Sequence, residues 1–157
     1  MPEPILVSAC LLGLRTRYDG TQKRDQSVLD YLKSNDYLPI PVCPEQLAGL
    51  PTPREEVHFT DGDGTDVLNG SGYVANRTGQ EMNTAFVRGA TETLEVCRLT
   101  GCQSALLKER SPSCGVHMVY CNEERVPGKG VTAALLEKAG IRLLSEQDIS
   151  PEPLIEK

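Results

Sequence analysis

Apolar residues occur along the chain in four short runs that are typical of strands. The run at 4–9 (PILVSA) is continuous and bounded by a proline and a glycine-containing turn, as expected for a short buried strand. The runs at 103–108 (QSALLK) and 141–144 (IRLL) have the same character. The run at 37–42 (YLPIPV) contains two prolines, which lack the N–H that a central strand needs, so we expect either a position at a sheet edge or an irregular start.

Three other segments carry apolar residues at helical spacing. Residues 80–99 place five apolar side chains on one face and predict an amphipathic helix. Residues 27–35 and 131–139 predict two shorter helices, the second ended by Gly140 in the position expected for a C-terminal cap. Strands that alternate with helices imply parallel strands joined by crossovers. The predicted fold class is therefore α/β: one three-layer, Rossmann-like domain over residues 1–157, with a mostly parallel sheet.

The segment 52–79 departs from this pattern. It is rich in Gly, Asp and Asn and offers only 57–59 and 72–74 as possible short strands. A segment this long with so little core material is usually functional or mobile. We expect either a solvated hairpin excursion or a lid over a substrate.

Composition and charge narrow the class of protein. The chain has 157 residues, 39% hydrophobic and 24% charged, with a formal net charge of −6. The acidic balance and the lack of a basic stripe argue against stable nucleic-acid binding and favour a small substrate. No apolar run approaches a membrane span, and the residues before Cys10 lack the basic and apolar regions of a signal peptide. We expect a cytoplasmic protein.

A cytoplasmic location changes how the six cysteines are interpreted. Stable disulfides are rare in reducing compartments, so these cysteines indicate metal binding, catalysis or packing. Cys97, Cys102 and Cys121 are expected to pack, since free cysteine is among the most buried residue types.

The other three cysteines each follow a predicted strand. Cys10, Cys43 and Cys114 come after the first, second and third strands, and the carboxyl ends of parallel strands share one edge of a sheet. Three convergent thiolates indicate a soft metal centre, either zinc or an iron–sulfur cluster, unless the three are unrelated. Structural zinc favours local CxxC spacing, which is missing here. Three cysteines without a fourth ligand would leave one iron of a 4Fe-4S cluster open to substrate.

Polar residues near these cysteines are candidate catalytic groups. Glu45 lies two residues after Cys43, and Ser111 precedes Pro112, which restrains its backbone. The alternatives are a solvated loop carboxylate or helix-end charge for Glu45 and an ordinary turn serine for Ser111. The glycines of 128–130 open a predicted helix whose free N–H groups could hold an anion.

Four motifs of the sequence resemble those of a known protein family. VSACLLGLRTRYDG, PVCPEQLAGLPTPR, LLKERSPSCG and PGKGVTAALLEKAGI are similar, in this order and over nearly the whole chain, to the signature blocks of a bacterial family first catalogued as a domain of unknown function. That family includes the thiouracil desulfidases. The resemblance implies an α/β fold that carries a 4Fe-4S cluster on three cysteines. It also implies removal of sulfur from a thiolated pyrimidine, 4-thiouracil or its nucleoside, to give the oxo base and sulfide.

Carried over residue by residue, the resemblance assigns Cys10, Cys43 and Cys114 as cluster ligands and Glu45 and Ser111 as the acid–base pair. The implied reaction is hydrolysis of the C–S bond without net redox change, in which Glu45 activates water and Ser111 relays protons. The chain departs from the family pattern after Arg54 and at 121–125, near the expected pocket mouth. Two alternatives are a non-catalytic metal- or sulfide-binding module and a sulfur-transfer accessory protein.

Overall fold

The apolar run near the N-terminus forms strand β1 (Glu3–Ser8), which lies inside a four-stranded sheet, sheet A. The computed structural model describes residues 1–149. Sheet A has the strand order β2-β1-β5-β8, and all its pairs are parallel. Its other strands are β2 (Tyr37–Val42), β5 (Ser104–Leu107) and β8 (Arg142–Ser145). The proline-containing β2 lies at an edge, the first of the two expected alternatives.

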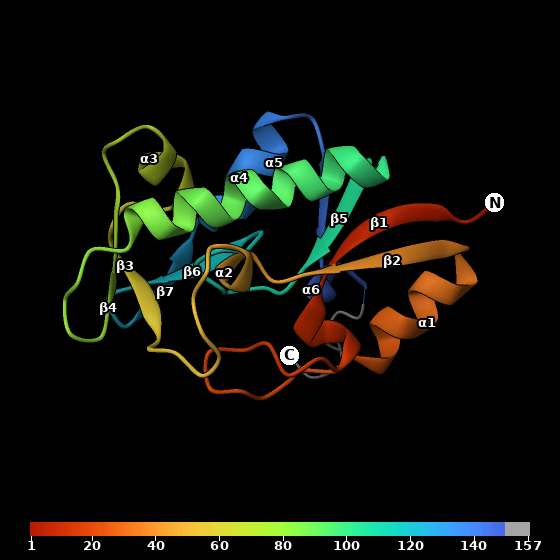
Figure 1. Cartoon of the computed structure of the whole chain (residues 1–157), viewed down its shortest axis with the longest axis horizontal. Helices are drawn as coiled ribbons and strands as arrows, with labels where there is room; N and C mark the ends of the chain where they lie inside the picture. Colours follow the sequence, from red (N-terminus) through yellow and green to blue (C-terminus); the bar gives the residue numbers. More distant parts are fainter. Residues whose placement is uncertain (150–157) are drawn as a thin grey trace, which may run out of the picture.

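Alternating side chains of sheet A fill two separate cores. Leu6 packs into a cluster with residues of helices α4 (Asn83–Thr100) and α5 (Val131–Lys138), whereas Ile5 and Val7 pack against α1 (Gln26–Ser34). The short α6 (Glu146–Ile149) contacts α1 on that second side. Helices therefore cover both faces of the sheet (Figure 1), and the α/β class is confirmed.

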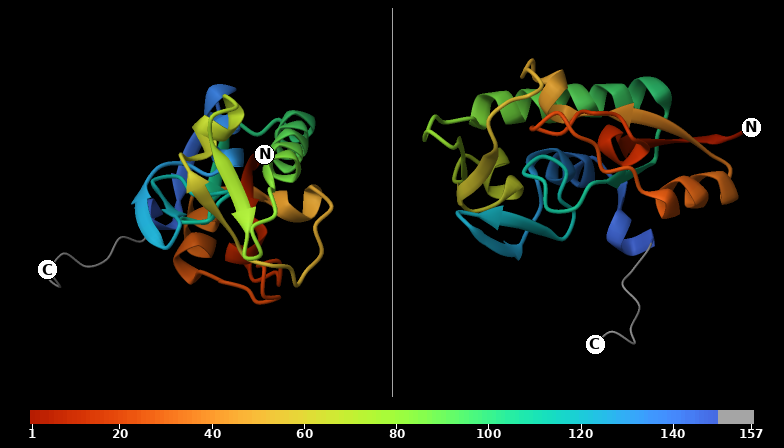
Figure 2. Two further views of the ribbon diagram at one scale, coloured as in Figure 1. Left: turned by 90° about the vertical axis from the view of Figure 1, so that its left-hand side faces the viewer. Right: turned by 90° about the horizontal axis from the view of Figure 1, so that it is seen from below.

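The glycine-rich segment is part of a third core. Strands β3 (Val57–Asp61) and β4 (Tyr73–Asn76) form an antiparallel hairpin around helix α3 (Gly64–Leu68). They join β6 (Met118–Cys121) and β7 (Glu124–Pro127) in sheet B, with the order β4-β3-β6-β7 (Figure 2). The side chains of Phe59 and Val74 are fully buried. The two short strands were predicted, but the expectation that this segment holds little core material was wrong.

Two short helices follow the strands of sheet A and shape its carboxyl edge. The 3₁₀ helix η1 (Ala9–Leu12) begins directly after β1, and α2 (Pro44–Leu47) begins directly after β2. Pro44 opens α2, where the missing proline N–H costs no helical hydrogen bond. Residues 10, 43 and 45 therefore lie at one edge of the sheet.

Within residues 1–149, no helix combines the length and the apolar character needed to cross a lipid bilayer.

Candidate active site

A large cavity lies at the carboxyl edge of sheet A and extends toward sheet B. Its volume is about 1300 Å³, and its walls include Cys10, Cys43 and Cys114. Glu45 and Ser111 line the same cavity. The structure thus brings all five candidate residues of the sequence analysis to one place.

Each of the three cysteines is positioned by a different strand end. Cys10 lies in η1, Cys43 caps the N-terminus of α2, and Cys114 lies in the loop between β5 and β6. Cys10 and Cys114 are buried, and the Cys43 sulfur lies 3.6 Å from the carbonyl oxygen of Thr16. The parallel order of β2, β1 and β5 explains why these distant residues meet.

Burial favours the protonated form of these three thiols. It raises the pKa of Cys114 to about 12 and that of Cys10 to about 11, and it also raises the pKa of Cys43. A metal reverses this effect because a coordinating thiol is deprotonated outright. Among residues 1–149, no three His, Cys, Asp or Glu side chains lie close enough to share one metal ion. The donor set of three thiols is one that suits iron–sulfur ligation.

The remaining cysteines and His117 do not line the cavity. Cys97 and Cys102 are buried in the core between sheet A and α4, and the Cys97 thiol donates to the Cys102 carbonyl at 3.2 Å. Cys121 lies in β6 and does not line the cavity. His117 pairs with Asp148 at 3.1 Å, whereas His58 lines the cavity from β3.

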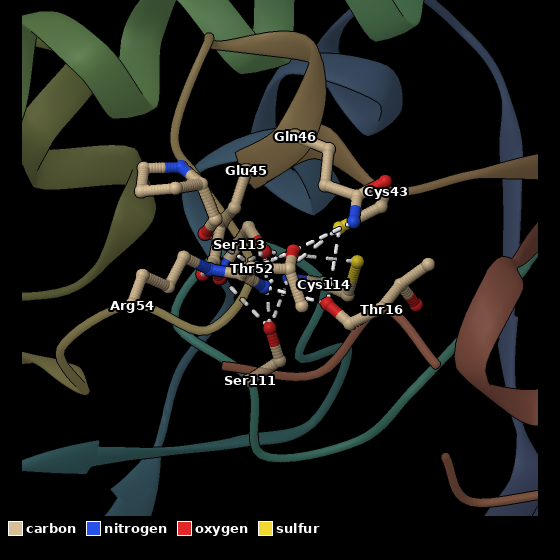
Figure 3. Close-up of polar contacts among 10 residues, drawn as sticks. Thr16, Cys43, Glu45, Gln46, Thr52, Arg54, Ser111, Ser113 and Cys114 are labelled. Atoms are coloured by element: carbon tan, nitrogen blue, oxygen red, sulfur yellow. Dashed lines mark hydrogen bonds and ion pairs between the residues drawn. The ribbon is translucent and has the colours of Figure 1, made fainter. Parts of the chain in front are cut away.

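Glu45 and Ser111 are connected through a second serine. The Ser113 hydroxyl donates to Glu45 Oε2 at 3.1 Å and lies 3.0 Å from the Ser111 hydroxyl (Figure 3). Ser111 Oγ also accepts hydrogen bonds from the backbone N–H groups of Ser113 and Cys114, both at 3.1 Å. The Ser-Pro-Ser-Cys turn therefore fixes the hydroxyls and one candidate ligand together.

Arg54 is a site residue that the sequence analysis did not assign. Its Nε donates to Glu45 Oε1 at 2.8 Å, and its Nη2 lies 3.8 Å from the Cys43 sulfur (Figure 3). The Arg54 and Glu45 side chains are only 7% and 12% exposed. The sequence contained a signal for this contact, because Arg54 is the only Lys or Arg between Lys33 and Arg77 and is thus the basic residue nearest to Glu45 along the chain.

The N-terminus of α5 holds the loop that carries Ser111 and Cys114. The N–H of Val131 donates to the Pro112 carbonyl, and the N–H groups of Thr132 and Ala133 donate to the Ser113 carbonyl. These donors are thereby occupied within the protein. The prediction that the glycine-rich helix start of 128–130 offers free N–H groups to an anion was wrong.

Comparisons with known proteins agree with the motifs. Residues 5–148 match the family described as 2-thiouracil desulfurase. The uncharacterized protein YbbK of Bacillus subtilis (strain 168) is 36% identical over 149 residues, which cover 93% of this chain and 97% of YbbK. A solved structure of a 4Fe-4S-dependent thiouracil desulfidase, TudS, superposes with a TM-score of 0.80 and 38% identity, covering 94% of this chain and 93% of that one. The chain therefore belongs to the 2-thiouracil desulfurase family.

Proposed function

We propose that this protein is a 4Fe-4S-dependent thiouracil desulfidase, with the cluster held by Cys10, Cys43 and Cys114. The observation that carries the proposal is the placement of three thiols, two of them buried and the third partly buried, on one cavity next to the Glu45–Ser113–Ser111 hydrogen bonds. The similarity to TudS, described as 4Fe-4S-dependent, supports the same cofactor here.

The donor set fits a cluster. Each thiolate of a 4Fe-4S cluster would bind a different iron, so the three side chains need not meet at a single metal ion. Three protein ligands would leave one iron position open, and an open iron would supply Lewis-acid polarisation of a C=S bond. All six cysteines are free, which fits a reducing compartment, and we propose the cytoplasm.

Glu45 and Ser111 supply the proton transfers. The reaction replaces the substrate sulfur by a water oxygen, so water loses two protons and the departing sulfur gains two, directly or by way of the ring nitrogen, to leave as H₂S. Glu45 accepts one proton from water, and Ser111 delivers a proton to the substrate. No electrons are gained or lost overall.

The proposed substrate is a thiolated pyrimidine, either the free base 4-thiouracil or its nucleoside. The cavity of about 1300 Å³ has room for both. Tyr18 and Tyr120 line it and offer aromatic faces for a pyrimidine ring.

The proposal is tested with protein purified without oxygen. Its absorbance should show thiolate-to-iron bands, and added 4-thiouracil should lose its thiocarbonyl band as sulfide is released in equal amount. Glu45→Gln should keep the iron bands and lower turnover by about 100-fold or more, because a general base contributes about 10²–10⁴ in rate.

Glu124→Gln is the matched control, because Glu124 is exposed on β7 and does not line the cavity. It should turn over like the wild type. A protein with iron bands that leaves 4-thiouracil intact would instead support the binding module, and unchanged turnover in Glu45→Gln would remove Glu45 as the base.

A further inference from the structure

Ser113 lies between the two groups to which we assign proton transfer. Its hydroxyl is 3.0 Å from Ser111 Oγ and 3.1 Å from Glu45 Oε2. Among the described residues, no hydrogen bond joins Ser111 directly to Glu45. Ser113 is itself buried, with only 3% exposure, so bulk water does not easily replace its hydroxyl.

The direction of these hydrogen bonds follows from counting protons. An ionised carboxylate only accepts hydrogen bonds, and each serine hydroxyl has one proton to donate. The Ser113 proton therefore points to Glu45 Oε2, which is closer and a stronger acceptor than the Cys114 sulfur at 3.8 Å. Ser113 then has no proton left for Ser111, so Ser111 donates to Ser113.

Arg54 leaves only one carboxylate oxygen of Glu45 for the hydrogen-bonded path to Ser111. Its Nε donates a charge-assisted hydrogen bond to Glu45 Oε1 at 2.8 Å. The other oxygen, Oε2, faces Ser113. A proton that moves between Glu45 and Ser111 along these contacts must pass through the Ser113 hydroxyl.

We propose that Ser113 is a positioning residue that passes protons between Glu45 and Ser111, an inference that rests on the proposed desulfidase function. While Glu45 is ionised, the Ser111 proton points to Ser113 and away from the substrate. When Glu45 has taken a proton from water, its new O–H donates to Ser113, and Ser113 donates to Ser111. The Ser111 proton is then released toward the substrate.

The count closes for the one proton relayed in each turnover, while the second proton of water passes from the attacking oxygen to the departing sulfur. Glu45 gains one proton from water, Ser111 loses one to the substrate, Ser113 gives its own to Ser111, and Glu45 gives its proton to Ser113. Four O–H bonds break, three form on the protein and one bond to hydrogen forms on the substrate. The protein returns to its starting state, and no oxidant or reductant is needed.

Four proteins test this relay: the wild type, Ser111→Ala, Ser113→Ala and the double variant. We expect Ser113→Ala to lower kcat about 100-fold, with an unchanged KM, an unchanged iron-band absorbance and an unchanged dissociation constant for the product uracil. Because both serines serve one path, the double variant should be no slower than the slower single variant. Ser104→Ala removes another buried serine, at the opposite end of β5 from the site, and should turn over like the wild type.

The possible outcomes separate the relay from the function. Wild-type protein that carries iron but releases no sulfide overturns the proposed function and the relay with it. Active wild type with a fully active Ser113→Ala variant overturns the relay alone, as do losses that multiply in the double variant. A Ser113→Ala variant that loses its iron bands, or binds uracil more weakly, would make Ser113 structural and would also overturn the relay.

Discussion

At the scale of single residues, Arg54 links the candidate base to a candidate ligand. Its guanidinium donates to Glu45 Oε1 and to the Thr16 carbonyl, both at 2.8 Å, and lies 3.8 Å from the Cys43 sulfur. The remaining donors reach the Thr52 hydroxyl and the Pro51 carbonyl. A planar fork of five N–H groups can satisfy all these acceptors, which the three donors of lysine cannot do.

Arg54→Gln should therefore weaken both the fold and the reaction. Removing one partner of a largely buried ion pair costs about 3–5 kcal/mol, so the free energy of unfolding should fall by that order in urea titrations. Turnover should fall as well, because Glu45 loses the contact that directs Oε2 to Ser113. Arg77→Gln is the stability control, since the Arg77–Glu56 pair is 75% and 49% exposed and should contribute less than about 1 kcal/mol. Equal effects of the two substitutions would contradict the role of Arg54.

At the scale of elements, the position of Glu45 depends on close packing between α2 and α4. Gly89 of α4 faces α2, and a Cβ at this position would lie 2.2 Å from the Pro44 carbonyl oxygen. Only glycine allows the two helices this approach. The helix that begins at Pro44 carries Glu45 in its first turn, so the packing also positions the carboxylate that we propose as the base.

Gly89→Ala should displace α2 and lower both stability and turnover. Overpacking costs about 1–3 kcal/mol, which outweighs the gain of up to about 1 kcal/mol in helix propensity. Thermal unfolding and sulfide release measure the two effects. Thr91→Ala, at an exposed position of the same helix, should be close to neutral. A Gly89→Ala protein as stable and as active as the wild type would show that α2 tolerates the shift.

The loop between β5 and β6 is anchored by a buried carboxylate. Glu109 Oε1 accepts hydrogen bonds from the N–H groups of Val116 and His117 at 2.8 Å and of Met118 at 3.0 Å. Burial alone would raise the pKa of Glu109, but these backbone donors outweigh it and hold the pKa below its ordinary value of 4.5. The loop that carries Ser111, Ser113 and Cys114 therefore closes on an ionised side chain.

Glu109→Gln should lower the free energy of unfolding by about 1–3 kcal/mol at neutral pH. Because the folded pKa is lowered, the wild-type contribution is fully present above the ordinary carboxyl range and is lost as the pH falls through the lowered value. The difference between wild type and variant should thus shrink in acid. Urea titrations at several pH values measure it, with the exposed Glu124→Gln as control. A difference that grows toward acid pH would contradict the ionised anchor.

The sequence predicted the elements of sheet A better than those of sheet B. Continuous apolar runs and helical spacing identified β1, α1 and β2 within about one residue, since these patterns are local. Sheet B depends on pairing between distant segments, such as Phe59 with Cys121, which no local pattern predicts. Helix α3 was missed because its short sequence resembles a loop, although Asp63 and Asp66 form the capping box at its start.

The candidate site was predictable from the sequence where it depends on strand order, and not where it depends on contacts between side chains. The convergence of Cys10, Cys43 and Cys114 followed from the parallel order of three strands. The contacts of Arg54 and Ser113 did not, because they depend on which side chains of neighbouring loops face one another.

At the scale of the whole molecule, the proposed cluster joins three segments that are far apart in sequence. Cys10, Cys43 and Cys114 follow β1, β2 and β5, and helices on both sides of sheet A hold these strand ends in place. Cys97, Cys102 and Cys121 lie outside the cavity and serve as controls for the three proposed ligands, because they are the same residue type in the same chain.

The most direct test is the iron content of six single Cys→Ala variants, each reconstituted with iron and sulfide without oxygen. Replacing Cys10, Cys43 or Cys114 should abolish the iron bands and the bound iron, whereas replacing Cys97, Cys102 or Cys121 should leave wild-type iron content. Full iron content in any of the first three variants, or its loss in any folded variant of the other three, would contradict the proposed ligand set.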